Sequence, residues 1–228
     1  MSVRPLGIPD LLDRLETHHG AQQPCWPVDP YEFLIWWHCG YPASDAACSR
    51  GWEAVKRTFG VDPEKILAAP LAKLTETLKG SGMFPEVRAA YLKEIAQRVQ
   101  SEFGGDLHAA LVAMGDKARK ALKSFHSIAD PGADRILLFA RIAPIAAVPS
   151  NCIQVLDRIR NGTDPDTYAA SYRDAQKAIE AEVPRQFHAR TRAYLLLKEH
   201  GQTLCKRANP KCGQCPVRDG CAFFANSR

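Results

Sequence analysis

Four cysteines stand close together in the stretch CKRANPKCGQCPVRDGC at residues 205–221. Their spacing is C-x6-C-x2-C-x5-C, so only the central pair forms the C-x2-C knuckle that structural zinc sites commonly use twice. Thiolates spread this widely along one loop suit an iron–sulfur cubane, because each thiolate must reach a different iron. The spacing therefore predicts a [4Fe–4S] cluster, with a zinc site or unliganded thiols as the alternatives. The predicted ligands are Cys205, Cys212, Cys215 and Cys221.

Cationic side chains are interleaved with these cysteines. They are Lys206, Arg207, Lys211 and Arg218. A loop folded around a cluster would hold these side chains rigidly and turn them outward, where they could bind phosphate groups. The net charge of +5 is compatible with a polyanionic partner. A basic loop that is merely solvated is the alternative interpretation.

The composition is that of an ordinary globular protein. Of the 228 residues, 46% are hydrophobic and 24% are charged, a balance that allows a buried core. No apolar run approaches the roughly 18 residues of a membrane span. The first twenty residues contain acids and histidines where a secretory signal would be apolar. We therefore expect a cytoplasmic protein, whose reduced thiols act as ligands rather than in disulfides.

Helix signals follow one another along the whole chain. Residues 8–18 carry an apolar stripe with helical spacing, and Asp29-Pro30 and Asp62-Pro63 each place a cap before a proline at the first helical position. Little alternates with period two, so the sequence predicts an all-α fold. Further helices are expected over 70–80, 85–103, 106–114, 116–125 and 133–143, from Pro149 to Gly162, from Asp164-Pro165 to 183, and from Pro184 to Gly201.

The cysteine spacing in an all-helical chain resembles that of endonuclease III and its adenine-glycosylase relatives, DNA base-excision enzymes of the helix-hairpin-helix superfamily. The resemblance extends from PYEFLIWW, beginning at Pro30, to Cys221. It implies a monomer that binds double-stranded DNA. It also implies two lobes: a helical module over residues 30–142 that carries the hairpin, and a cluster lobe formed by residues 1–29 and 143–228.

The family's hairpin motif has the form L-P-G-(V/I)-G-x-x-T-A, and the matching stretch is FHSIADPGADRILLF at residues 125–139. In the family, backbone N–H groups of this turn hold a DNA phosphate. Ser127 and Ala129 replace the two glycines, and Gly132 is expected to supply part of the missing backbone freedom. The resemblance assigns the phosphate contact to Ser127, Ile128, Ala129 and Gly132. An ordinary helix-turn-helix corner is the alternative.

The resemblance fails at the catalytic positions. Bifunctional relatives carry a nucleophilic lysine where this chain has Pro131, so no lyase activity is expected. Catalytic relatives also carry an aspartate where this chain has Pro149. Asp134, one helical turn after Pro131, is the candidate for a relocated acid, with Asp130 and Asp157 as alternatives.

These features predict a monofunctional DNA N-glycosylase of base-excision repair, associated with the nucleoid if the source is bacterial. A non-catalytic DNA-binding protein that kept the scaffold is the second hypothesis. A redox-responsive or zinc-binding regulator, supported only by the cysteines, is the third. The base that would be removed cannot be read from the sequence.

Overall fold

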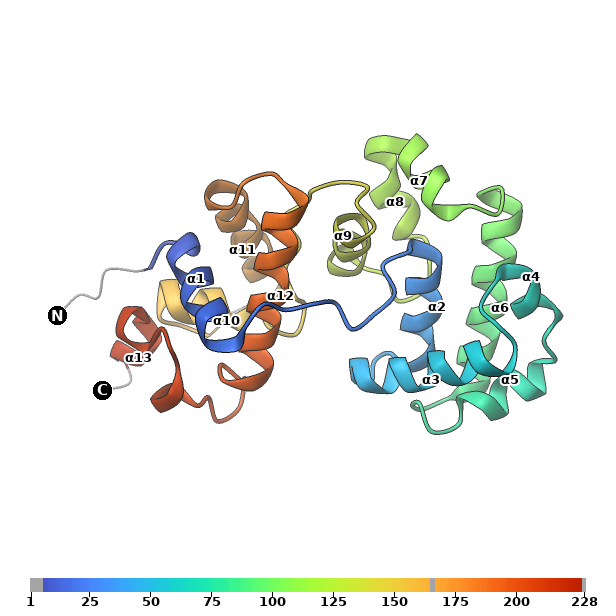
Figure 1. Cartoon of the computed structure of the whole chain (residues 1–228), viewed down its shortest axis with the longest axis horizontal. Helices are drawn as coiled ribbons and strands as arrows, with labels where there is room; N and C mark the ends of the chain where they lie inside the picture. The colour runs from blue at the N-terminus through green and yellow to red at the C-terminus, as the bar shows by residue number, and fades with distance from the viewer. Residues whose placement is uncertain (1–5, 165–166, 227–228) are drawn as a thin grey trace. The chain divides into compact units, whose positions relative to one another are not determined.

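The computed structural model describes residues 6–164 and 167–226, and no strand occurs among them (Figure 1). The prediction of an all-α fold is confirmed. Besides α-helices there are three short 3-10 helices (η1, η3, η4) and one π-helical segment (η2). In chain order the elements are α1 (Ile8–His19), α2 (Pro30–Gly40), α3 (Asp45–Thr58), α4 (Pro63–Ala68), α5 (Leu71–Leu78), α6 (Pro85–Glu102), α7 (Leu107–Met114), η1 (Gly115–Lys117), α8 (Ala118–Leu122), α9 (Asp130–Phe139), α10 (Gln154–Leu156), η2 (Asp157–Asn161), α11 (Tyr168–Glu182), α12 (Phe187–Thr203), η3 (Cys212–Gln214), η4 (Arg218–Gly220) and α13 (Ala222–Asn226).

The chain divides into two compact units. The central unit contains residues 24–129, and the terminal unit joins the residues up to 23 with those from 130 onward. The boundaries expected from the sequence were 30 and 142, so α9 belongs to a different unit from the one expected. Side chains explain this, because Asp134 of α9 is hydrogen-bonded to Tyr172 and Gln176 of α11.

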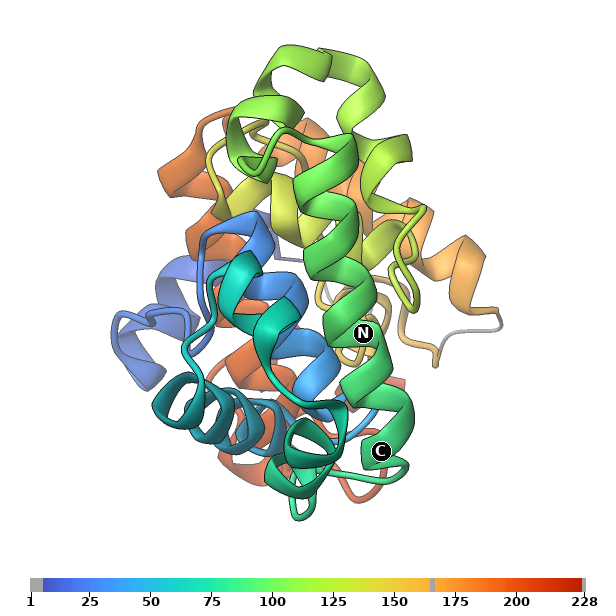
Figure 2. The ribbon, with the colours of Figure 1, turned by 90° about the vertical axis from the view of Figure 1, so that its right-hand side faces the viewer.

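The central unit is built around α2 and α6, which pack against each other (Figure 2). Asp29 caps α2 by accepting the N–H of Glu32 at 2.9 Å, as its position before Pro30 predicts. Trp36 of α2 is fully buried and anchors the core. Helix α3 packs on α2, and α4 and α5 pack on α6.

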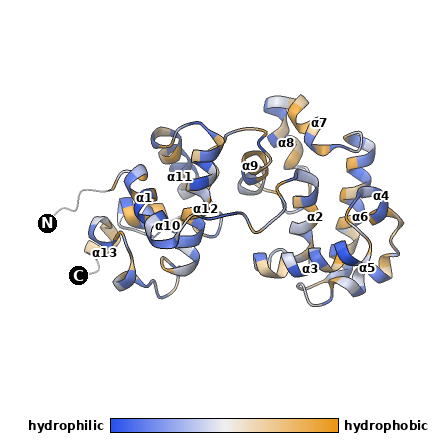
Figure 3. Cartoon of the chain, viewed as in Figure 1, coloured by the Kyte–Doolittle hydropathy of each residue, from blue (hydrophilic) through white to orange (hydrophobic). Residues whose placement is uncertain are grey.

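The terminal unit brings distant parts of the sequence together, since α1 packs against α12 and α11. The predicted stripe of α1 is buried, and its members are Ile8, Leu11, Leu12 and Leu15. The N–H of Ile8 donates to Glu182 at the end of α11. In Figure 3, orange apolar and blue polar residues share most helices, which is the pattern of helices that bury one face. No helix in residues 6–164 and 167–226 is long and apolar enough to span a bilayer.

Several helix boundaries differ from those expected. Helix α9 begins at Asp130, because Pro131 is tolerated in a first helical turn. The loop before this helix is therefore shorter than the loop over residues 127–132 that the sequence predicts. Thr167, not Asp164, caps α11 by accepting the N–H of Ala170; Pro165 lies outside the described residues. Helix α12 begins at Phe187 rather than Pro184.

One whole helix, α3, lacks a clear signal in the sequence. Its buried residues are Ala47, Cys48, Gly51 and Val55, which are too small to give a strong apolar stripe. Gly51 is required there, because a Cβ would lie 2.7 Å from that of Ser81. Cys25 is exposed, whereas Cys39, Cys48 and Cys152 are buried.

Candidate functional site

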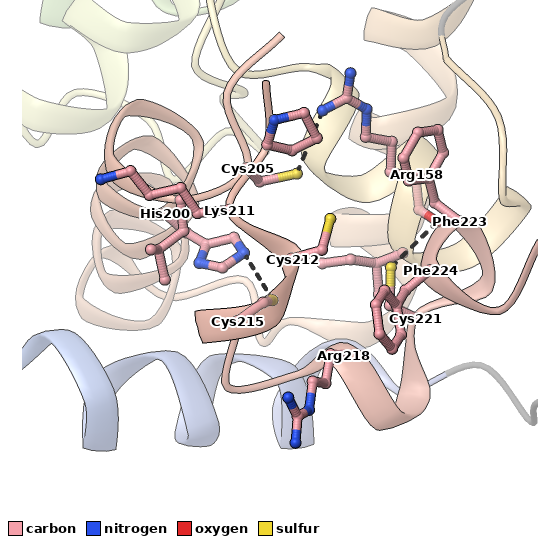
Figure 4. A pocket seen from close by; sticks show the side chains of 13 residues that line it. Arg158, His200, Cys205, Lys211, Cys212, Cys215, Arg218, Cys221, Phe223 and Phe224 are labelled. Carbon is pink, nitrogen blue, oxygen red and sulfur yellow. Dashed lines mark hydrogen bonds between the residues drawn. The ribbon is translucent and has the colours of Figure 1, made fainter. Parts of the chain in front are cut away.

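Residues 205–221 are called the thiol loop from here on, and their four cysteines line one hollow (Figure 4). They come from the end of α12, from η3 and from either side of η4. None is in a disulfide. Burial raises the pKa of the Cys205 and Cys221 thiols and raises that of Cys215 to about 11. Raised pKa values favour neutral thiols, and a bound metal would hold these groups as thiolates.

Arg158 of η2 fastens the start of the thiol loop. Its guanidinium donates to the carbonyl oxygens of Lys206 at 2.7 Å and Arg207 at 3.0 Å. It also lies 3.9 Å from the Cys205 sulfur and 2.5 Å from a carboxylate oxygen of Asp164. Because these four groups converge on one buried guanidinium, the backbone that presents Cys205 has a defined position.

His200 supports the hollow from α12. It is fully buried, with Nε2 3.7 Å from the Cys215 sulfur and Nδ1 3.2 Å from Nε2 of His19 in α1. Burial lowers the pKa of His200 to about 4, with His19 and His18 adding to the shift, so the ring is neutral at pH 7. A neutral imidazole has one N–H, which serves either the sulfur or the second histidine.

The donor set is compatible with an iron–sulfur cluster, because the four thiols line a common space and cysteine thiolates are the usual ligands of such clusters. In the described part of the chain, no three His, Cys, Asp or Glu side chains are grouped so as to hold one metal ion. Phe223 and Phe224 complete the lining with apolar surface.

All four cationic side chains of the thiol loop are exposed. Arg218 donates to the Gly213 carbonyl at 3.0 Å and points away from the thiols in Figure 4. The loop therefore presents positive charge outward, and its contact with DNA stays a prediction.

The hairpin lies between α8 and α9. Its apolar anchors, Phe125, Ile128 and Ala133, are buried. Ser127 is exposed and has a φ of 56°, so a serine occupies the left-handed conformation that glycine would adopt without strain. Gly132 lies inside α9, where it does not supply the backbone freedom expected of it.

Side chains of α2 and α6 hold this turn. Nε2 of His38 lies 2.9 Å from the His126 carbonyl, and Nδ1 lies 2.7 Å from the Leu34 carbonyl. Tyr91 stacks on the His126 ring with centroids 4.4 Å apart, and Glu94 lies 3.2 Å from its Nε2. Burial lowers the pKa of His38, although both carbonyls oppose the shift. The contact between His38 and the hairpin could not be predicted from the sequence, because His38 and His126 are 88 positions apart.

The positions of the family's catalytic residues offer no reactive group. Pro131 is in the first turn of α9, and Pro149 is buried in the loop before α10. Asp134 has no exposed surface, and its carboxylate accepts from Tyr172 at 2.7 Å and Gln176 at 2.9 Å. Such a carboxylate does not reach a nucleotide in this conformation. Its burial favours a structural role, and catalysis by Asp134 stays a prediction.

Comparisons with known proteins agree with this geometry. The family described as HhH-GPD superfamily base excision DNA repair protein matches residues 43–181. A thymine-DNA glycosylase of Aeropyrum pernix is 23% identical over 173 residues, 72% of this chain and 70% of that protein. Endonuclease III of Bacillus subtilis is 20% identical over 193 residues, 85% of this chain and 81% of that protein.

Solved structures show the same fold. A non-covalent endonuclease III–DNA complex has a TM-score of 0.75 at 17% identity and covers 96% of both chains. A thermostable thymine-DNA glycosylase has a TM-score of 0.73 at 19% identity, over 96% of this chain and 97% of that one.

Proposed function

The chain belongs to the HhH-GPD superfamily of base excision DNA repair proteins, and on that premise we propose that it is a monofunctional DNA N-glycosylase. It would act on double-stranded DNA and hydrolyse the bond between the sugar and a damaged or mispaired base. The observation that carries the proposal is the family match over residues 43–181, together with relatives named as DNA glycosylases.

The thiol loop is proposed to hold a [4Fe–4S] cluster through its four cysteines. What supports this is the shared hollow, the apolar lining and the buried Arg158 that fixes the loop's first turn. When bound, the cluster would supply rigid cross-links between the ligands. The chain's own residues do the rest: Arg158 orients the Cys205 segment, and His200 orients Cys215.

DNA binding is proposed to use two surfaces. The turn at Ser127–Ala129 would offer backbone N–H groups to a phosphate, and the exposed cations of the thiol loop would add contacts to the backbone. Such contacts position the enzyme without reading the base sequence.

The chemistry would proceed without a covalent step, because Pro131 has no amine to form a Schiff base. Pro149 has no carboxylate to stabilise positive charge on the sugar or to activate water. The two prolines favour a second candidate function, that of a non-catalytic protein that has the same scaffold and binds DNA lesions. The two candidates differ in one observable, the release of a base.

The test is incubation of the purified protein with duplexes that carry single lesions. T·G and U·G mispairs belong in the set because two relatives are named as thymine-DNA and thymine/uracil-DNA glycosylases. Abasic sites are scored by alkali cleavage, and covalent intermediates by borohydride trapping. Base release without a trapped adduct is expected. Tight lesion binding with no release would establish the non-catalytic candidate instead.

A further inference from the structure

A second basic region lies on the terminal unit, away from the thiol loop in sequence. It is an open hollow formed by α11, the start of α12 and the loop after α9. Four cationic side chains line it against a single carboxylate, that of Glu180. The cations are Arg173, Lys177, Arg185 and Arg190. We propose that this hollow binds a phosphate group of the DNA backbone, an inference that rests on the proposed function.

Arg190 shows that the hollow is a built site. The side chain is only 2% exposed, although it carries a permanent charge. One end of the guanidinium donates to the Pro144 carbonyl and pairs with Glu180 at 2.7 Å. Its Nε is buried and has no hydrogen-bond partner among the described residues. A buried N–H of this kind normally has an acceptor, and a bound anion would provide one.

The remaining cations are not neutralised by neighbouring acids. Arg173 and Arg185 are exposed, and neither forms an ion pair or hydrogen bond within the described residues. Lys177 approaches Asp174 at 3.6 Å, but both side chains are mostly exposed, so that pair is weak. The hollow therefore keeps a net positive charge for a ligand. Guanidinium groups match the oxygens of a phosphate in pairs, which favours phosphate over a simple halide.

The floor of the hollow is rigid because the loop after α9 is tied to both flanking helices. Gln176 of α11 donates to the Ala146 carbonyl at 3.1 Å, and Arg190 of α12 donates to that of Pro144. Gln176 also donates to Asp134, so the same amide links the hollow to α9. The loop continues to Pro149. A phosphate bound here would hold a DNA strand beside the segment in which relatives carry their aspartate.

The test uses the double variant Arg173→Glu/Arg185→Glu. Both residues are exposed, so the fold should persist, and its circular dichroism should match that of the parent. Lys73→Glu/Lys79→Glu, on α5 and at the residue that follows it, is the control, because it changes the net charge equally at exposed residues of the central unit. We expect the hollow variant to weaken duplex binding by about 10- to 100-fold and to reduce the slope of log affinity against log salt by about 2. The control should keep both values within about twofold of the parent.

Titration with inorganic phosphate separates the two sources of the ligand. Weak phosphate binding that disappears in the hollow variant, together with the loss in duplex affinity, would support the proposal. Phosphate binding that disappears while duplex affinity stays at the parent's value would overturn the DNA assignment and leave a site for free phosphate. Unchanged binding of both ligands would overturn the site itself. A parent that binds duplex but releases no base would count against the glycosylase proposal without affecting the hollow.

Discussion

The thiol loop and the segment from Ser127 to Pro149 differ in how closely their residues match the motifs of the family. In the thiol loop all four expected ligands are present, and buried Arg158 and His200 hold the backbone around them. In the other segment, serine and proline stand where glycine, lysine and aspartate are expected. Other contacts hold that segment in place. His38 and Tyr91 contact His126 at the turn, and Tyr172 donates a hydrogen bond to Asp134.

The comparison teaches that the scaffold and the chemistry of this fold are separable. Ligands that cross-link a loop have no substitute, because removing one thiolate leaves an iron without its protein ligand. A catalytic group can be lost without loss of the fold, since nothing in the core depends on it. The following predictions test this separation, from the largest expected effect to the smallest.

Replacing Cys212 with serine should remove the cluster and unfold the thiol loop. The free energy of unfolding of the terminal unit should fall by on the order of 5 kcal/mol, as when a structural metal site is lost. Iron and sulfide content, visible absorbance and thermal unfolding measure the effect. Cys25→Ser is the matched control, because Cys25 is an exposed cysteine outside the loop. A colourless parent protein with one zinc per chain would contradict the cluster assignment.

Replacing Pro149 with aspartate should restore the carboxylate that the family carries. Base release should rise by about 10²- to 10⁴-fold, the usual contribution of a positioned catalytic group. Single-turnover alkali-cleavage assays measure it, with thermal unfolding as a check because Pro149 is buried. Pro9→Asp, at an exposed proline of the same unit outside the basic hollow, should leave base release unchanged. A stable Pro149→Asp protein with parental base release would show that more than one group is missing.

Replacing Asp134 with asparagine should lower the free energy of unfolding by about 2 kcal/mol, because hydrogen bonds to a charged acceptor are weakened. Base release, measured in the folded fraction, tests the prediction that Asp134 is the relocated acid. Tyr172→Phe removes the partner, and the double variant should lose less than the sum of the two. If Asp134→Asn instead abolishes base release at unchanged stability and DNA affinity, the carboxylate is the relocated acid.

Glu182 makes the terminal unit sensitive to acid. Burial raises its pKa, but the Ile8 N–H and Arg160 outweigh burial and hold the pKa below its usual value of 4.5. A depressed pKa means that the folded state favours the carboxylate. This stabilisation is complete well above pH 4.5 and is lost as the pH falls through the folded-state pKa. Glu182→Gln should therefore destabilise at pH 7 by about 1–2 kcal/mol and much less at pH 3. Equal losses at both pH values would contradict this assignment.

Replacing Ser127 with glycine should have the smallest effect. It relieves the left-handed strain and removes the Cβ beside the proposed phosphate, so duplex affinity should rise by about two- to fivefold. Asn209→Gly is the control, because Asn209 of the thiol loop also has a positive φ, of 52°. The affinities of the parent and the Ser127→Gly variant for duplex DNA are compared at one salt concentration. Weaker binding by the variant would show that the serine side chain itself contacts DNA.

The fold class could be predicted because proline and aspartate mark many of the helix starts and the apolar stripes have helical spacing. Helix α3 was missed because small residues form its buried face, and the boundary at α9 was misplaced because it depends on contacts of Asp134 with α11. The grouping of the four cysteines could be predicted because their spacing is local in sequence, and the structure places them around one hollow; their role as ligands stays a prediction. His200, Arg158 and Arg190 could not be assigned in this way, because a polar residue on a helix has many possible partners until the helices pack.

The packing of α1 on α12 sets the order in which the protein can mature during translation. Residues 24–129 form a unit that can fold as soon as it leaves the ribosome. Residues 8–19 must wait for residues 187–203, which at about 5–20 residues per second takes roughly ten to forty seconds. During that delay the apolar stripe of α1 has no native partner. Chaperone demand, and the moment at which the proposed cluster can be inserted, should therefore follow the completion of α12 rather than the folding of the central unit.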